Sequence, residues 1–153
     1  MSKKQPETTR SAWPLFVTAH AALVERMEAE LAAAGLPELA WYDVLWAIER
    51  APRHKLRLHE LAHALVFSRS NLTRLVDRIE EAGFVKRERA ADDRRGYYAV
   101  ITPAGLALRK KMWPVYAKAI DSYFDRHLTA AENGVLRSVL RRLLDAARAT
   151  RRA

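Results

Sequence analysis

Residues 59–63 read HELAH, which has the HExxH spacing used by zinc hydrolases. On a helix the two histidines lie one turn apart and can bind zinc, while the glutamate can act as a general base. The longer metzincin pattern also needs a glycine and a third histidine, but Val66 and Arg69 occupy those positions. Chance produces HExxH in about one chain in a hundred of this composition. Zinc hydrolysis is therefore only a remote alternative.

Other catalytic chemistry has little support in the sequence. Cysteine is absent, which excludes disulfides, thiolate metal sites and cysteine nucleophiles from this chain. We find no glycine-rich phosphate loop, nucleophile elbow or paired-carboxylate motif. We therefore expect a protein that is not an enzyme and that needs no cofactor and no metal.

Charge points to a polyanionic partner. The 153 residues include 27 Lys and Arg against 18 Asp and Glu, a net charge of +9, which favours double-stranded DNA or another polyanion. Charged residues interrupt every apolar stretch before the roughly 18 positions of a membrane span, and MSKKQPETTR lacks an apolar signal core. The length predicts a single domain over residues 1–153, and we expect it in the cytoplasm with no membrane partner.

A helix beginning at Ser68 and ending at Gly83 carries the residues best suited to DNA. Ser68 suits an N-cap, and an apolar stripe runs through Leu72, Leu75, Val76 and Ile79. The remaining surface can hydrogen-bond bases or phosphates. The candidate DNA-binding residues are Ser68, Arg69, Ser70, Asn71, Thr73, Arg74 and Arg78. The alternative is a solvated face on which Asp77 pairs with Arg74 or Arg78, and Arg78 is equally suited to a structural pair.

A charged hairpin follows this helix. Residues 84–90 and 97–101 are β-rich and are joined by ADDRRG at 91–96. Arg95 suits the narrow minor groove of A·T-rich DNA. The simpler alternative is a hairpin tip that is merely solvated.

Helices flank this segment on both sides. Apolar periodicity predicts a helix over 11–34, a second ending near Arg50, a short strand at 55–58 and a helix at 59–65. Thr102 and Pro103 open another helix, whose stripe continues to His127 and which Pro114 should kink. A capping box of Thr129 and Glu132 begins the last helix. The long apolar stripes predict burial across a two-fold axis.

The order helix, strand, helix, tight turn, helix and hairpin is that of a winged helix-turn-helix. Residues 58–105, LHELAHALVFSRSNLTRLVDRIEEAGFVKRERAADDRRGYYAVITPAG, resemble the MarR (multiple antibiotic resistance regulator) family. The resemblance implies a mostly α fold with a small two- or three-stranded β wing. It also implies that Asp93 orients Arg95 and that Arg94 contacts a phosphate.

The resemblance further implies an obligate homodimer on a pseudo-palindromic operator. Dimerisation would use helices of 11–50 and 103–150, and residues 55–102 would form the DNA-binding lobe. Repression would be relieved by a small aromatic ligand between the dimer helices and that lobe. An effector-independent architectural DNA-binding protein is the main alternative, but a helix carrying Asn71 and Arg74 favours operator recognition.

Aromatic residues concentrate on the first two predicted helices. The candidate effector-pocket residues are Trp13, Phe16, His20, Trp41, Tyr42 and Trp46. The alternative is that they form core or dimer interface, as aromatic stripes at helical spacing usually do. If they line a pocket, the net positive charge predicts an aromatic anion as its ligand.

Overall fold

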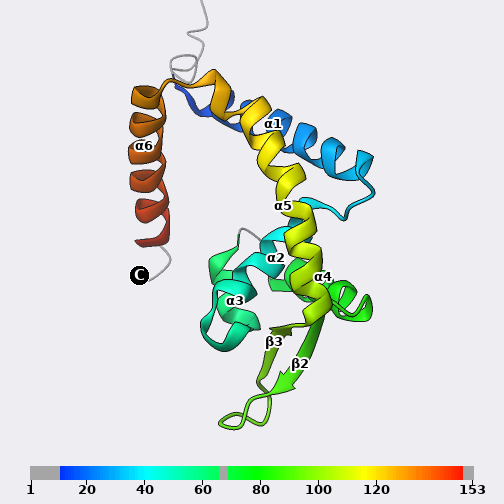
Figure 1. Ribbon diagram of the computed structural model, residues 1–153. Helices are drawn as coiled ribbons and strands as arrows, with labels where there is room; N and C mark the ends of the chain where they lie inside the picture. The colour runs from blue at the N-terminus through cyan, green and yellow to red at the C-terminus, as the bar shows by residue number, and fades with distance from the viewer. Residues whose placement is uncertain (1–10, 66–68, 150–153) are drawn as a thin grey trace, which may run out of the picture. The chain divides into compact units, whose positions relative to one another are not determined.

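A computed structural model describes residues 11–65 and 69–149, so the predicted N-cap Ser68 lies outside the described residues. The described chain is mostly helical, with one small sheet (Figure 1). Its elements are α1 (Trp13–Ala33), α2 (Leu39–Arg50), η2 (Pro52–His54), β1 (Lys55–Arg57), α3 (Leu58–Ala64), α4 (Arg69–Glu81), β2 (Val85–Arg89), β3 (Tyr97–Ile101), α5 (Pro103–Tyr123), η3 (Asp125–His127) and α6 (Ala130–Ala149).

The described residues divide into two compact units. One comprises residues 11–26 and 118–149, and the other comprises residues 27–117 as far as they are described. The second unit contains α2, α3, α4 and the sheet. The single domain expected over 1–153, with dimer helices at 11–50 and 103–150, remains a prediction.

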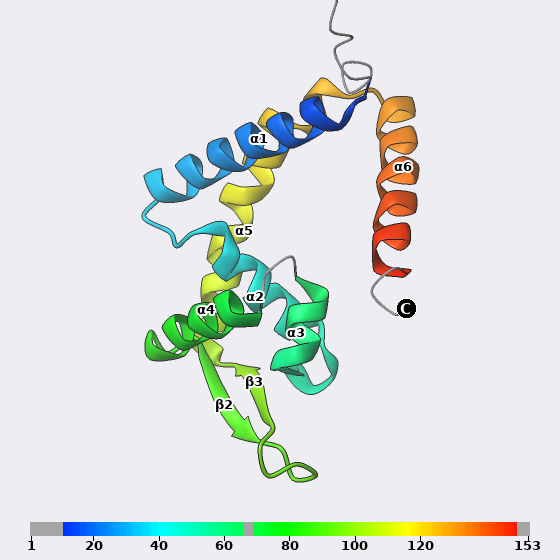
Figure 2. The ribbon, with the colours of Figure 1, turned by 180° about the vertical axis from the view of Figure 1, so that it is seen from behind.

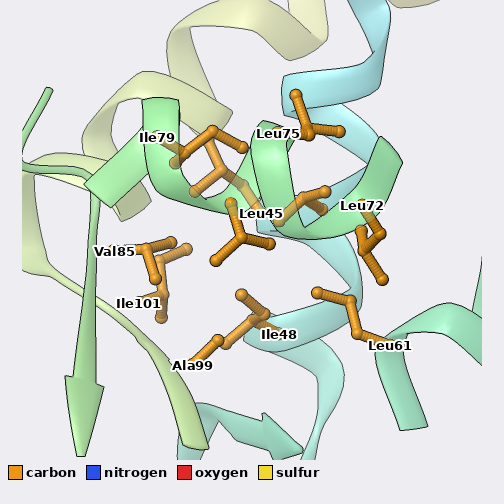
Figure 3. Close-up of a cluster of buried hydrophobic side chains, with 11 residues drawn as sticks. Leu45, Ile48, Leu61, Leu72, Leu75, Ile79, Val85, Ala99 and Ile101 are labelled. Atoms are coloured by element: carbon orange, nitrogen blue, oxygen red, sulfur yellow. The ribbon is translucent and has the colours of Figure 1, made fainter. Parts of the chain in front are cut away.

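The core of the second unit lies where α2, α3 and α4 meet the sheet (Figure 3). Leu72, Leu75, Val76 and Ile79 of α4 are all buried, which confirms the predicted stripe. Removing such side chains from water is the main force that holds small domains together. They pack with Leu45, Ile48, Leu61, Val85, Ala99 and Ile101.

The sheet has three antiparallel strands in the order β1-β3-β2. Val85 of β2 is opposite Ile101 of β3, and Leu56 of β1 is opposite Ala99. Side chains alternate between faces along a strand, so Ala99 and Ile101 of β3 point together into the core. The β2–β3 hairpin projects away from α2, α3 and α4 in both views of the chain (Figures 1 and 2).

Thr102 joins the sheet to α5. Its hydroxyl donates to the carbonyl of Gly83 (2.8 Å) and accepts from the amide of Gly105 (3.1 Å). Its own amide donates to the carbonyl of Phe84 (3.1 Å). This confirms Thr102 and Pro103 as the start of the helix, because the threonine oxygen satisfies an amide of the first turn.

The last two helices differ from the prediction at one boundary. α5 passes through Pro114 but ends at Tyr123, so the expected continuation to His127 is wrong: η3 occupies 125–127. The backbone turns at Phe124, where φ is −127° and ψ is −68°. α6 begins with the predicted capping box, in which the amide of Glu132 donates to the Thr129 hydroxyl at 3.2 Å.

Within 11–65 and 69–149, no helix meets the length and hydropathy that a membrane span requires.

Candidate nucleic-acid interface

The exposed face of α4 carries the predicted base-reading residues. Asn71 and Arg74 are exposed and Thr73 is half-buried, on the side opposite the buried stripe. Arg69 and Ser70 occupy the first turn of α4. Arg74 forms no ion pair within the described part of the chain. Its guanidinium group is therefore available to a partner.

The C-terminal half of α4 is held by ion pairs. Arg78 Nη2 lies 2.6 Å from a carboxylate oxygen of Glu38, the residue just before α2. Of the two predicted roles of Arg78, a DNA contact and a structural ion pair, the structure shows the ion pair. Asp77 pairs with Arg87 of β2, which also approaches Glu80 at 3.0 Å. The alternative pairing of Asp77 with Arg74 or Arg78 is not found among the described residues, because Asp77 pairs with Arg87. Ion pairs within the described residues therefore hold Asp77 and Arg78 but not Arg74.

Arg57 fixes the tip of the hairpin. Its guanidinium group lies 2.6 Å from Asp92 and 3.4 Å from Asp93, and it packs over the Tyr98 ring. A hydrogen bond with Tyr98 and the nearby carboxylates raise the pKa of Arg57 above its ordinary value. Sequence reasoning missed this residue, because nothing local connects Arg57 with a turn 35 residues away.

Asp93 also orders the loop that carries the wing arginines. Its second carboxylate oxygen accepts a hydrogen bond from the amide of Arg95 at 3.0 Å. The side chains of Arg94 and Arg95 are exposed. The loop therefore presents two cations from a backbone that Asp93 and Arg57 hold in place.

A hollow of about 590 Å³ joins the helix face to the hairpin. It is lined by Thr73 of α4, His59 of α3 and Arg95 of the wing loop, among others. Residues that are far apart in sequence thus surround one concave, partly basic surface.

The HELAH segment lies in α3, the helix that precedes α4. Glu60, the expected general base, instead accepts a hydrogen bond from the amide of Arg57 (2.7 Å) at the start of α3. His59 and His63 are exposed. Across 11–65 and 69–149, no group of three or more metal-binding side chains gathers. The pattern is explained by helix capping and packing.

A buried three-helix core, a second helix with a polar exposed face and a basic hairpin beside it define a winged helix-turn-helix DNA-binding protein. Family comparison agrees: residues 34–96 match the model of the MarR family. The transcriptional repressor MprA of Escherichia coli K12 is 27% identical over 122 residues, covering 80% of this chain and 68% of MprA.

Solved structures extend the likeness to nearly the whole chain. AbsC, a MarR family transcriptional regulator from Streptomyces coelicolor, has a TM-score of 0.85 and 26% identity, covering 97% of this chain and 99% of AbsC. Sco3205 from the same organism, solved in complex with DNA, has a TM-score of 0.82 and 26% identity, covering 89% and 88%. The chain is thus similar to MarR family proteins in sequence and in fold, and these relatives are transcriptional regulators rather than enzymes.

A second candidate site lies between α2 and α5. A pocket of about 450 Å³ includes Tyr42 and Trp46, two of the predicted effector residues. Trp41 does not line it, because its ring packs edge-on against Phe84 beside the core, at 5.9 Å between centroids. The pocket is lined by Tyr42, Asp43, Trp46, Arg109, Trp113 and Tyr116.

The other predicted aromatic residues belong to the other unit. Trp13 and Phe16 pack together at 6.1 Å between centroids, yet both remain exposed, and His20 is exposed as well. The residues that sequence reasoning missed are Asp43, Arg109, Trp113 and Tyr116. Trp113 and Tyr116 stand three apart on α5, a helical spacing that could have suggested a shared face.

Tyr42 is the centre of an aromatic cluster in this pocket. Its ring lies 5.1 Å from Tyr116, 6.0 Å from Trp113 and 6.5 Å from Trp46, centroid to centroid. Burial raises the pKa of the Tyr42 hydroxyl, despite the nearby Arg109. Trp46 and Trp113 remain partly exposed. The cluster combines a fixed ring with two accessible indoles.

Arg109 and Glu49 form a two-pronged ion pair beside the rings. Arg109 Nη2 lies 2.8 Å from one carboxylate oxygen of Glu49, and Arg109 Nε donates to the other. The guanidinium group also lies 5.0 Å from the centroid of Trp46. The hydrogen bonds to Glu49 raise the pKa of Arg109. Both side chains are largely buried, so the pair is a fixed part of the wall.

Asp43 is a carboxylate of this pocket with a raised pKa and no ion-pair partner among the described residues. Burial, with a smaller contribution from the Glu28 carboxylate, raises the pKa of Asp43 from 3.8 to about 6. Glu28 itself accepts the amide of Leu39 at 2.9 and 3.1 Å, which caps the start of α2. Asp43 has neither a hydrogen bond nor an ion pair from its side chain within the described residues.

Asp43 should make folding stability depend on pH. The folded state retains this proton up to about pH 6, whereas the unfolded chain loses it near 3.8, so stability falls as pH rises through that window. Asp43→Asn cannot ionise, and its free energy of unfolding relative to the parent should increase by about 2 kcal/mol between pH 4 and pH 7.5. Urea melts at both pH values measure this. A difference that stays constant with pH would contradict the assignment.

Proposed function

We propose that the protein is a homodimeric, ligand-responsive repressor that works in the cytoplasm on a pseudo-palindromic operator. The proposed recognition-helix contacts are Ser68, Arg69, Ser70, Asn71, Thr73, Arg74 and Arg78, and the proposed wing residues are Asp93, Arg94 and Arg95. Arg78 would reach DNA only by leaving Glu38, which makes it the weakest member of the set.

The observation that carries the proposal is the placement of Arg74 and Arg95 on one lobe. Arg74 is exposed on the helix that enters the major groove in winged helix proteins, and Arg95 projects from an ordered loop of the hairpin. Guanidinium groups read guanine edges in the major groove and fill narrow minor grooves. The helix and the wing would thus read adjacent grooves of one half-site.

Assembly as a dimer is supported by apolar side chains without cover in the first unit. Trp13 is 67% exposed and Leu15 is 74% exposed on α1, and Val135 is 65% exposed on α6. Burying such residues against a second copy would remove them from water. We expect sedimentation to show a dimer at micromolar concentration and selected operators to contain half-sites about 10 base pairs apart. A folded monomer under these conditions would contradict the proposal.

Arg95→Ala should lower the affinity for operators with A·T-rich flanks most strongly. A narrow minor groove concentrates negative potential around the arginine, so these operators depend most on it. We expect a drop of about tenfold on A·T flanks and a smaller drop on G·C flanks. Titration of both operators with the parent and variant proteins tests this. Arg126→Ala, on the 125–127 turn, is the exposed arginine control. Equal losses on both flanks would remove the minor-groove role.

The pocket between α2 and α5 is the proposed effector site. α2 carries Tyr42 and Trp46 on the pocket side and Leu45 and Ile48 on the core side, so a ligand would act on the element that supports α4. A ligand can shift DNA binding only through differential affinity for two lobe spacings, and about 1–3 kcal/mol of coupling would suffice. Trp13, Phe16 and His20 do not line this pocket, and their role as effector residues stays a prediction from the sequence.

Thermodynamic reciprocity provides the test of effector control. Operator DNA must lower the affinity of the protein for the ligand by the same factor by which the ligand lowers its affinity for operator DNA. Calorimetric titration of each in the presence and absence of the other measures both factors. If no aromatic compound shifts DNA affinity, the architectural, effector-independent alternative is favoured.

A further inference from the structure

We propose that the ligand of the α2–α5 pocket is an aromatic cation and not an aromatic acid. The inference rests on the proposed ligand-responsive function and adds to it the charge of the ligand. It follows from which of the charged side chains of the pocket are already neutralised.

The pocket has one carboxylate that is not neutralised. Asp43 lines the cavity and has no cationic partner within the described residues, although it is largely withdrawn from water. Glu28, which faces it from α1, adds negative potential and is held by the amide of Leu39. Withdrawing a carboxylate from water is costly unless a cation or donor compensates. A cationic ligand would supply that compensation.

Arg109, the cationic side chain of the pocket wall, already has a counter-ion. Arg109 directs Nε and Nη2 at the two carboxylate oxygens of Glu49. An incoming ligand carboxylate would have to compete with Glu49 for these donors. It would also lie near Asp43, and like charges at close range in a partly buried site repel. Aromatic acids are therefore disfavoured on both counts.

The remaining wall is made of aromatic faces. Tyr42, Trp46, Trp113 and Tyr116 surround the carboxylate, and the indoles of Trp46 and Trp113 remain accessible. Ring faces attract cations through their quadrupoles, most strongly for tryptophan. Trp46 already shows this preference, because Arg50 and Arg109 lie 5.6 and 5.0 Å from its ring centroid. Aromatic rings around a carboxylate form a site suited to a planar cation.

Local charge outweighs the net charge of the chain here. The value of +9 predicts an anion, but exposed charges beyond about 8–10 Å are screened at physiological salt. The groups within contact distance of a ligand decide its sign. The lining supplies one unpaired carboxylate, four aromatic rings and Arg109, which Glu49 neutralises from behind the wall, whereas Arg50 beside the Trp46 ring is exposed to solvent.

Three compounds of matched shape test the inference on the full chain at pH 8. They are N-methylquinolinium, its uncharged isostere 1-methylnaphthalene, and the anion 1-naphthoate. Quenching of tryptophan fluorescence reports binding, since Trp46 and Trp113 line the pocket. We expect the cation to bind at least tenfold more tightly than the isostere, and the naphthoate to bind more weakly than either.

Two pocket variants and one control sharpen the test. Asp43→Asn should reduce N-methylquinolinium affinity at least tenfold and leave 1-methylnaphthalene unchanged. Glu49→Gln should release Arg109 and thereby improve 1-naphthoate binding several-fold. Asp145→Asn, an exposed acid-to-amide change on α6, should alter none of the three affinities. Thermal melts confirm that each variant is folded.

The outcomes separate the inference from the proposed function. Tighter binding of 1-naphthoate than of N-methylquinolinium, with no effect of Asp43→Asn, would overturn the cation and retain the pocket. Failure of all three compounds to bind would remove the pocket as an effector site, and the inference with it, while leaving the proposed DNA binding in place. The inference is supported if Asp43→Asn weakens N-methylquinolinium binding while Asp145→Asn does not.

Discussion

Arg74→Ala is expected to weaken operator binding about 5- to 150-fold, which corresponds to about 1–3 kcal/mol, and to affect random DNA much less. The guanidinium group is exposed on α4 and unpaired within the described residues, so it can make a bidentate contact with a guanine edge. Base contacts carry sequence information, whereas phosphate contacts do not. Losing this side chain should therefore lower specificity more than general affinity.

The measurement is the ratio of operator to random-DNA affinity at fixed salt, because phosphate binding depends steeply on ionic strength. Arg141→Ala on α6 is the matched control and should leave the ratio unchanged. Arg78→Ala breaks the ion pair with Glu38 and separates the structural effect from the base contact. If Arg74→Ala lowers both affinities equally, Arg74 holds a phosphate and does not read a base.

Gly105→Ala should destabilise the protein by about 3 kcal/mol, near the upper limit for overpacking. A Cβ atom at this position would lie 2.1 Å from the carbonyl oxygen of Phe84 and 2.9 Å from Ile101 Cγ1. The first neighbour is backbone, so relief requires moving the junction between α4 and β2. That junction carries the hydrogen bonds of Thr102, which would be strained together with it.

Gly134→Ala provides the matched control for this substitution. Gly134 lies inside α6 and a Cβ atom there meets nothing within 4 Å. Alanine loses less conformational entropy than glycine in a helix, so this variant should stabilise the protein by about 0.5–1 kcal/mol. Urea unfolding followed by circular dichroism measures both variants. Similar effects at the two positions would show that the close approach at Gly105 can be relieved cheaply.

The sequence by itself determined most of the helices and strands, though not the end of α5, and it indicated the DNA-binding class. The stripe of Leu72, Leu75, Val76 and Ile79 repeats with the period of a helix, and the structure buries all four. Thr102 and the Thr129–Glu132 capping box marked helix starts through local hydrogen bonds. Such features depend on residues within a few positions of one another, which is why periodicity and capping rules read them correctly.

The tertiary structure decided which charges meet. Arg57 reaches a wing tip 35 residues away, and Arg109 pairs with Glu49 across 60 residues. It also turned Trp41 toward the core while Tyr42 and Trp46 face the pocket, and it left Asp43 without a counter-ion there. These outcomes depend on how helices and strands pack. Local propensities do not specify that packing, because an ion pair or a cavity wall forms only when distant elements are brought together.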